Sequence, residues 1–337
     1  MAEKSNGMSQ TAVYHGGNLQ EAMAQFGMPR DDWLDLSTGI NPTPYPNTTL
    51  ANSALHQLPQ TDMHDALRLA ARRYYEVPEG SDIVAAPGSQ AILQLLPAIL
   101  PNRSVSILGP TYEEHEKLWV SFGHQVDMIT TLSEINGTDT VVLVNPNNPD
   151  GRMIEPDELR NLAQSLPKPN GLLIVDEAFA DTAPSIAIMP GLNGQPILSI
   201  RSFGKFFGLP GLRLGFAAGA TTVVAMLRER LGPWAVSGPA MEIGTRALND
   251  TSWIEQAREK LTVRAEALDQ VLLGTGMTVA GGTALFRLVL THAAGEIFER
   301  LGHAGIFVRR FPDRPNWLRF GVPGTDDEIA RLKRALS

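Results

Sequence analysis

The sequence predicts an α/β protein with a large, mainly parallel sheet and a second, smaller α+β unit. Two observations support this prediction. Short apolar runs in the middle of the chain alternate with turn residues and longer helical stretches. These runs are apolar throughout rather than at every second position, which is typical of strands covered by helices on both faces of a sheet. The predicted strands are 83–86, 104–108, 140–144, 171–175 and 196–200.

The outer parts of the chain show different patterns. Residues 33–46 are rich in turn formers, and their prolines interrupt a helix, so we expect an extended arm there. A long helical region is predicted over 241–273, followed by strands at 284–290, 305–311 and 317–322 and a final helix over 326–336. These elements predict the smaller α+β unit.

Composition excludes several classes of protein. The 337 residues include 28 Lys and Arg against 36 Asp and Glu, a formal net charge of −8. Dispersed charge of this sign argues against nucleic-acid binding, which depends on neutralising phosphates. The absence of cysteine excludes disulfides and thiolate chemistry, and we expect no metal site. A polar N-terminus and the lack of an apolar run of roughly 20 residues favour a soluble, cytoplasmic protein without a signal peptide.

Residues able to do chemistry follow the predicted strands, where ligands bind in parallel α/β sheets. Lys205 follows the run 196–200 among aromatic residues and glycines. These neighbours would desolvate its amine and lower its pKa, as a Schiff-base lysine requires. One alternative, a nucleotide-triphosphate loop, is excluded because no GxxxxGK spacing is present. The other is a lysine that simply extends from a strand end to solvent.

Four further positions have both a functional and a structural interpretation. Asp176 ends a buried strand. In the functional interpretation this carboxylate pairs with a cation, such as a protonated ring nitrogen; in the structural one it caps a helix. Asn148, between prolines, is a fixed donor or a turn former. Ser89 and Gln90 begin a helix, which can bind an anion or carry an ordinary cap.

Two residues complete the candidate set. Arg213 lies in a glycine-rich loop and offers the permanent charge that a phosphate needs. Tyr112 follows another strand and offers a flat face for stacking, although a core aromatic would look the same. Together these positions supply an amine, a carboxylate, an amide, a stacking ring and a phosphate cradle.

The ordered motifs NPNNPDG (145–151), DEAF (176–179), SFGK (202–205) and GLPGLRLGF (208–216) resemble those of fold-type-I pyridoxal-phosphate enzymes. The resemblance is to the class I/II aminotransferase superfamily and extends over residues 15–322. It implies pyridoxal 5'-phosphate as cofactor and a homodimer. It also implies a large cofactor-binding domain over 45–233, an N-terminal arm over 1–44 joining the small domain, and a small C-terminal domain over 234–337.

The resemblance also implies roles for individual residues. Lys205 would bond the cofactor covalently, Asp176 would pair with the ring nitrogen, Asn148 would contact the ring hydroxyl, and Tyr112 would stack on the ring. The residues that would hold the cofactor phosphate are Ser89, Gln90, Ser202 and Arg213.

Within the superfamily, the sequence most resembles the threonine-phosphate decarboxylases of cobalamin biosynthesis, with histidinol-phosphate aminotransferases as near relatives. Phe179 stands where aminotransferases usually carry Tyr, which resembles the decarboxylase pattern; neutral drift is the alternative. The segment YHGGN, with His15 and Gly16, resembles an anion-binding motif of the decarboxylases, since glycines let the backbone approach an anion. The arm that contains Asn41 matches both subfamilies and is expected to close over the substrate.

Two arginines match substrate-binding positions of the family. Arg319 matches the arginine that binds the substrate carboxylate. One of Arg309 and Arg310, with Arg309 favoured, matches the arginine that binds a substrate phosphate, and only one of two neighbours on a strand can face the site. The resemblance therefore implies decarboxylation of L-threonine O-3-phosphate to (R)-1-amino-2-propanol O-2-phosphate. An aminotransferase is the alternative. A non-catalytic pyridoxal-phosphate-binding regulator is more remote, because the roughly 30 residues before the arm are too few for a DNA-binding domain.

Overall fold

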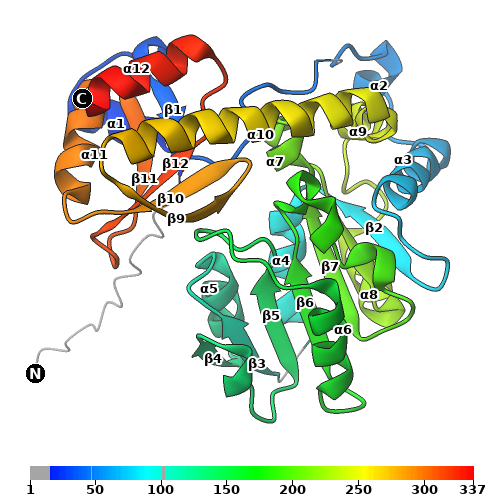
Figure 1. Cartoon of the computed structure of the whole chain (residues 1–337). Coiled ribbons are helices and arrows are strands. Elements are labelled where there is room, and N and C mark those ends of the chain that lie inside the picture. Colours follow the sequence, from blue (N-terminus) through cyan, green and yellow to red (C-terminus); the bar gives the residue numbers. More distant parts are fainter. Residues whose placement is uncertain (1–15, 47, 101–102) are drawn as a thin grey trace, which may run out of the picture.

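The computed structural model describes residues 16–46, 48–100 and 103–337. Its elements form two sheets with flanking helices, and the long helix α10 (Thr251–Gly274) runs from one part to the other (Figure 1). The described residues include no helix that is both long enough and apolar enough to cross a membrane.

The larger sheet has seven strands in the order β2-β8-β7-β6-β5-β3-β4. β8 is antiparallel to its neighbours β2 and β7, whereas the other pairs are parallel. This arrangement confirms the predicted large, mainly parallel sheet. Its strands are β2 (Asp82–Ala86), β3 (Ser104–Leu108), β4 (Gln125–Ile129), β5 (Thr140–Val144), β6 (Leu172–Asp176), β7 (Ile197–Ser202) and β8 (Gly215–Gly219).

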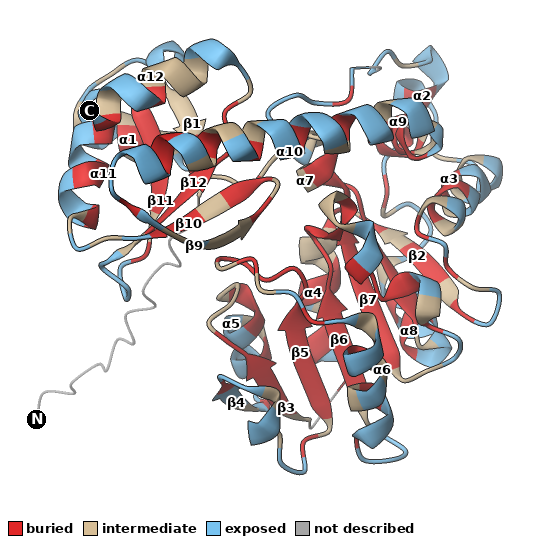
Figure 2. Cartoon of the chain, in the orientation of Figure 1, coloured by how far each residue is buried: buried red, intermediate tan, exposed pale blue. Residues whose placement is uncertain are grey.

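Helices on both faces explain why the central strands β5 and β6 are buried at every position (Figure 2). In β6, Leu173 and Val175 belong to the core that contains Leu159 of α6, whereas Ile174 belongs to the core that contains Ile92 of α4. β6 therefore buries both of its faces. The helices around this sheet are α2 (Asn52–His56), α3 (Thr61–Tyr74), α4 (Ser89–Ile99), α5 (Glu114–Ser121), α6 (Pro156–Ser165), α7 (Phe203–Phe206), α8 (Thr221–Leu231) and α9 (Gly238–Asn249).

The smaller sheet joins the two ends of the described chain. Its strand order is β1-β11-β12-β10-β9, with β1 (Leu34–Leu36) parallel to β11 and the other pairs antiparallel. Figure 1 shows the blue β1 among orange and red elements. The position at which the two units divide along the chain stays a prediction. The remaining elements are β9 (Thr278–Thr283), β10 (Phe286–Leu290), β11 (Ile306–Arg310), β12 (Trp317–Gly321), α1 (Leu19–Phe26), α11 (Ala294–His303) and α12 (Asp326–Leu336).

The structure differs from the sequence predictions in one helical region and in several strands. The helical region predicted over 241–273 is divided into α9 and α10, because the Asp250 carboxylate caps α10 by accepting the Trp253 N–H at 3.1 Å. β1, β4, β8 and β9 were not predicted as strands: β1 is a short strand within the predicted arm, exposed polar residues interrupt β4, and glycines and alanines dilute the apolar pattern of β8 and β9. The short 3₁₀ helices are Arg30–Asp32, Leu132–Glu134, Ala180–Thr182, Pro184–Ile186, Met189–Gly191 and Pro210–Leu212.

Candidate active site

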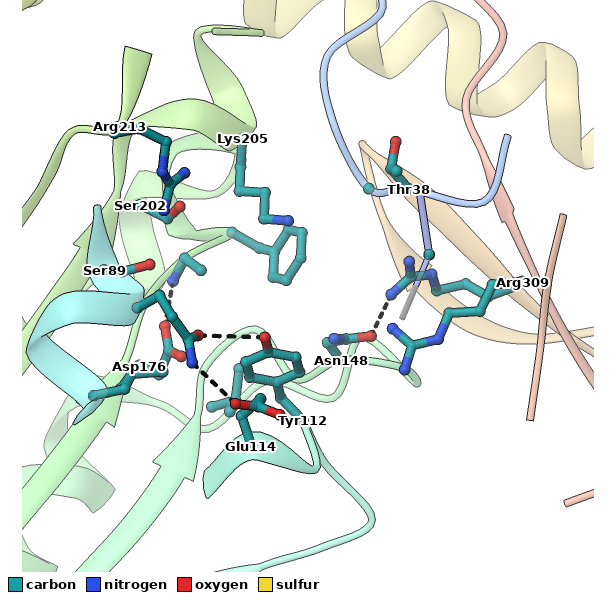
Figure 3. Close-up of a pocket in the computed structure, with 18 residues that line it drawn as sticks. Thr38, Ser89, Tyr112, Glu114, Asn148, Asp176, Ser202, Lys205, Arg213 and Arg309 are labelled. Atoms are coloured by element: carbon teal, nitrogen blue, oxygen red, sulfur yellow. Dashed lines mark hydrogen bonds between the residues drawn. The ribbon is translucent and has the colours of Figure 1, made fainter. Parts of the chain in front are cut away.

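A cavity of about 470 Å³ lies where the ends of the large-sheet strands face the smaller sheet (Figure 3). The large sheet contributes residues that follow several of its strands, and β11 and β12 contribute one arginine each. This is the edge of the sheet at which α/β proteins bind ligands. The lining residues are Gly16, Thr38, Gly39, Ser89, Gln90, Leu93, Tyr112, Glu114, Val144, Asn148, Asp176, Ala178, Phe179, Ser202, Lys205, Arg213, Arg309 and Arg319.

Lys205 projects into the cavity from α7, directly after β7. Its Nζ lies 5.7 Å from the centre of the Phe179 ring. Burial lowers the pKa of Lys205 to about 8, with a further lowering by Arg319 and an opposite effect of Asp176. Part of the amine is therefore neutral near neutral pH, so Nζ can act as a nucleophile and carry a proton.

Asp176 ends β6 and is only 4% exposed. Nε2 of the buried His115 lies 3.1 Å from its Oδ2, and the Ala178 N–H donates to its Oδ1 at 3.1 Å. These contacts offset the cost of burying the carboxylate and hold it at the cavity wall. A ligand with a cationic ring nitrogen fits this position.

A phosphate-sized cradle lies at the start of α4. Gly88 has φ +88°, and a Cβ added there would collide with the Arg213 guanidinium, so that guanidinium lies directly against the helix N-terminus. A Cβ at Gly215 would likewise collide with the backbone nitrogen of Ser89. The first N–H groups of a helix lack intrahelical acceptors and carry partial positive charge. Together with Arg213 and the nearby Ser202, they fit a phosphate dianion.

Arg309 and Arg319 form the wall of the cavity on the smaller sheet. They are paired residues of the antiparallel strands β11 and β12, and only 6% and 3% of their surfaces are exposed. Burial and the nearby Arg309 lower the pKa of Arg319 well below its usual value. Two buried like charges repel each other, and bound anions would relieve that repulsion. This wall therefore fits a ligand that carries anionic groups.

Asn148 connects the two halves of the cavity. Its Oδ1 accepts a hydrogen bond from Nη1 of Arg319 at 2.5 Å, and Nη2 of Arg319 donates to the Ser37 carbonyl at 2.9 Å. Because Arg319 occupies the amide oxygen, the amide nitrogen of Asn148 is the donor that can face a ligand.

The structure places Asn41 outside this cavity. Its Nδ2 donates to the Phe206 carbonyl at 2.9 Å, and its Oδ1 accepts the Thr43 N–H at 2.9 Å. The Asn41 amide thus fixes the arm along α7, and the substrate contact expected from the sequence stays a prediction. Thr38 and Gly39 are the arm residues that line the cavity.

Gly39 is required at its position by the two rings beside it. An added Cβ would lie 2.9 Å from a ring carbon of Phe286 and 3.0 Å from one of Phe179. The Phe179 and Phe286 rings pack edge to face, with centroids 5.0 Å apart. The arm therefore passes close to a fixed aromatic pair, and a larger residue would push it away from the cavity.

Because side chains alternate along β11, Arg309 and Arg310 point to opposite faces of the smaller sheet. Arg309 lines the cavity, whereas Nη2 of Arg310 lies 3.9 Å from Glu21 Oε1 and its guanidinium lies over the Phe298 ring. His15 lies outside the described residues, and Gly16 lines the cavity. The functional roles predicted for the cavity residues stay predictions.

Sequence reasoning missed two titratable residues of the site, Glu114 and His115. Both lie in the first turn of α5, and their neighbours in the sequence are charged. Such a segment is typical of an exposed helix start. The available signal was that both residues lie in the segment that follows the strand 104–108, at the edge of the sheet where ligands bind. The rings of Tyr112 and His115 pack edge to face at 6.0 Å.

Comparison with known proteins gives consistent similarities. The family model Aminotransferase class I and II matches residues 31–336. A threonine-phosphate decarboxylase of a Sinorhizobium species is 42% identical, covering 96% of this chain and 98% of that protein. One from Pseudomonas aeruginosa is 39% identical, covering 96% of each. The crystal structure of a Sinorhizobium meliloti histidinol-phosphate aminotransferase in complex with pyridoxal-5'-phosphate has a TM-score of 0.80 at 20% identity, covering 100% of this chain and 97% of that one.

Proposed function

Because the chain belongs to the class I and II aminotransferase family, we propose that it is a pyridoxal-phosphate-dependent decarboxylase. Its substrate is L-threonine O-3-phosphate, and its products are (R)-1-amino-2-propanol O-2-phosphate and carbon dioxide, a reaction of cobalamin biosynthesis. The observation that carries the proposal is the buried pair Arg309 and Arg319, which face the cavity beside Lys205. A substrate with both a phosphate and a carboxylate supplies one anion for each guanidinium. The two relatives of about 40% identity carry the name of this enzyme.

The cavity residues fit the cofactor at each of its functional groups. Asp176 would pair with the ring nitrogen, the Asn148 amide would donate to the ring oxygen, and the face of Tyr112 would cover the ring. The cradle at α4, with Ser89, the Gln90 backbone, Ser202 and Arg213, would hold the phosphate. Pyridoxal phosphate, when bound, supplies an electron sink for the charge that develops at the substrate α-carbon.

The two arginines of the smaller sheet would orient the substrate. Arg309 would bind the substrate phosphate and Arg319 the carboxylate, through planar forks suited to both anions. Holding both groups fixes which bond of the α-carbon is aligned for cleavage. The choice of reaction therefore depends on the placement of these two guanidiniums.

Lys205 would carry the proton that replaces the lost carboxyl group. With a pKa lowered to about 8, its Nζ can both accept and give a proton near neutral pH. The buried ring of Phe179 lies beside it and excludes water from that side. Phe179 has no hydroxyl, so it donates no hydrogen bond to the ring oxygen of the cofactor.

We also propose that the protein acts as a homodimer. Leu55 on α2 and Trp234 before α9 are large apolar residues that are 64% and 57% exposed, and α2 contacts α9. Such exposed side chains favour burial against a second subunit. Light scattering coupled to size exclusion measures the mass directly, and a monomer at micromolar concentration would contradict this part of the proposal.

A direct assay tests the reaction. Purified protein with pyridoxal phosphate should release carbon dioxide from L-threonine O-3-phosphate and form the amino-propanol phosphate. Transfer of the amino group to 2-oxoglutarate, measured in parallel without release of carbon dioxide, would instead identify an aminotransferase.

A further inference from the structure

The cavity contains a buried carboxylate that the proposed reaction does not use. Glu114, the first residue of α5, lines the cavity beside Tyr112 and is only 8% exposed (Figure 3). Its Oε1 lies 3.9 Å from Nζ of Lys117, whose side chain is half exposed. Such a pair contributes little, so the lysine does not by itself explain why a carboxylate is buried here.

The other carboxylate oxygen of Glu114 belongs to a hydrogen-bonded chain. Nε2 of Gln90 donates to Glu114 Oε2 at 3.0 Å, and the Tyr112 hydroxyl donates to Gln90 Oε1 at 3.4 Å. A carboxylate can only accept hydrogen bonds, so Glu114 forces the amide nitrogen of Gln90 toward itself. The amide oxygen of Gln90 is thereby turned to the Tyr112 hydroxyl. Figure 3 shows both bonds along one wall of the cavity.

This chain of hydrogen bonds connects the phosphate cradle at the start of α4 with the residues at the start of α5. Gln90 is the second residue of α4, at the phosphate cradle, whereas Tyr112 and Glu114 belong to the segment that begins α5. Burial and, next, the Glu114 charge raise the pKa of Tyr112 to about 12, so its hydroxyl stays a donor near neutral pH. Asp176, Arg309 and Glu113 also act on Tyr112, with smaller effects.

We propose that Glu114 is a positioning residue that acts through Gln90 to fix the ring plane of Tyr112 relative to the phosphate cradle. The inference rests on the proposed function, because a fixed ring plane matters only if a planar cofactor lies against it. In this role Glu114 acts through other residues and not by contact with the reacting atoms. Its effect should appear in how firmly and in what orientation the cofactor is held.

A double-mutant cycle tests this inference. The variants are Glu114→Ala, Gln90→Ala and the double variant, and Glu113→Ala is the matched control, since Glu113 is the adjacent carboxylate and does not line this cavity. The readouts are the dissociation constant of pyridoxal phosphate, from titration of the cofactor-free protein, and the visible circular dichroism of the bound cofactor. The dichroism reports how asymmetrically the ring is held.

If Glu114 acts through Gln90, each single variant should weaken cofactor binding about three- to tenfold, as expected for the loss of one or two hydrogen bonds. Each should also reduce the visible dichroism. The double variant should bind no more weakly than Gln90→Ala alone, and Glu113→Ala should match the wild type. Tyr112→Phe interrupts the chain of hydrogen bonds at its other end. Adding Glu114→Ala to Tyr112→Phe should therefore change neither the dissociation constant of pyridoxal phosphate nor the visible dichroism any further.

Three results would overturn the inference: additive effects of Glu114→Ala and Gln90→Ala, an unchanged dichroism in Glu114→Ala, or an equal effect of Glu113→Ala. In each case a wild-type protein that binds the cofactor and releases carbon dioxide leaves the proposed function intact. A wild-type protein that does not bind pyridoxal phosphate overturns the proposed function, and the inference with it.

Discussion

Replacing Lys205 by Met should stabilise the cofactor-free protein at neutral pH. In the folded protein, burial and then Arg319 lower the pKa of Lys205 from its usual 10.5 to about 8. At about 1.4 kcal/mol for each pH unit, this difference means that the charged amine costs the folded state about 3 kcal/mol. Met fills a similar volume without charge, so the variant avoids that cost.

The sign of the pH dependence follows from the direction of the shift. Because the folded pKa is the lower one, the unfolded chain binds more protons between pH 8 and 10.5, and wild-type stability rises with pH across this window. The stability advantage of Lys205→Met should therefore be about 3 kcal/mol at pH 7, about 2 kcal/mol at pH 9 and below about 1 kcal/mol at pH 10.

Urea unfolding of the cofactor-free wild type and variant at these three pH values measures the difference. Lys117→Met is the control, because that side chain is half exposed and its replacement should change stability by less than about 0.5 kcal/mol. A stability advantage that stays constant from pH 7 to pH 10, or a wild type that is more stable at pH 7, would refute the reasoning.

Other substitutions test the remaining parts of the site. His115→Phe removes a hydrogen-bond partner of the buried Asp176, so urea unfolding should show a loss of about 1–3 kcal/mol and titration a weaker affinity for pyridoxal phosphate. Gly88→Ala places a Cβ against the Arg213 guanidinium at a positive φ, so the titrated affinity for pyridoxal phosphate should fall at least about tenfold. Arg319→Leu should raise the KM for threonine phosphate about 100-fold in steady-state kinetics, while the visible absorbance of the bound cofactor is retained.

The sequence predicted best the parts of the site that follow buried strands. Asp176 comes directly after an apolar run and Lys205 follows shortly after another, and the carboxyl ends of parallel strands meet at one edge of a sheet whatever the conformation of the loops between them. For a similar reason the sequence predicted that only one of Arg309 and Arg310 faces the site, because a strand alternates its faces with a fixed period, whereas the structure was needed to show that Arg309 is the one. In these cases the regular backbone determines the direction of the side chain.

The parts that could not be predicted depend on tertiary contacts of single side chains. His115 and Glu114 lie in a charged segment, and only the packing of α5 against α4 turns them inward. Asn41 has the composition of a substrate contact, yet its amide bonds the backbone of α7 and its own arm. Local pattern does not decide between such competing hydrogen-bond partners.

The pairing of β1 with β11 has a consequence for the order in which the protein is made. Leu34 pairs with Ile306, so β1 leaves the ribosome long before its partner exists, and at typical synthesis rates it waits for tens of seconds. All seven strands of the larger sheet precede residue 220, so that sheet can form while β1 is still unpaired. The guanidiniums of Arg309 and Arg319 reach the cavity only when β11 and β12 join β1. The cavity is therefore completed last, and the newly made chain exposes its lysine and phosphate cradle before it has a wall to bind substrate anions.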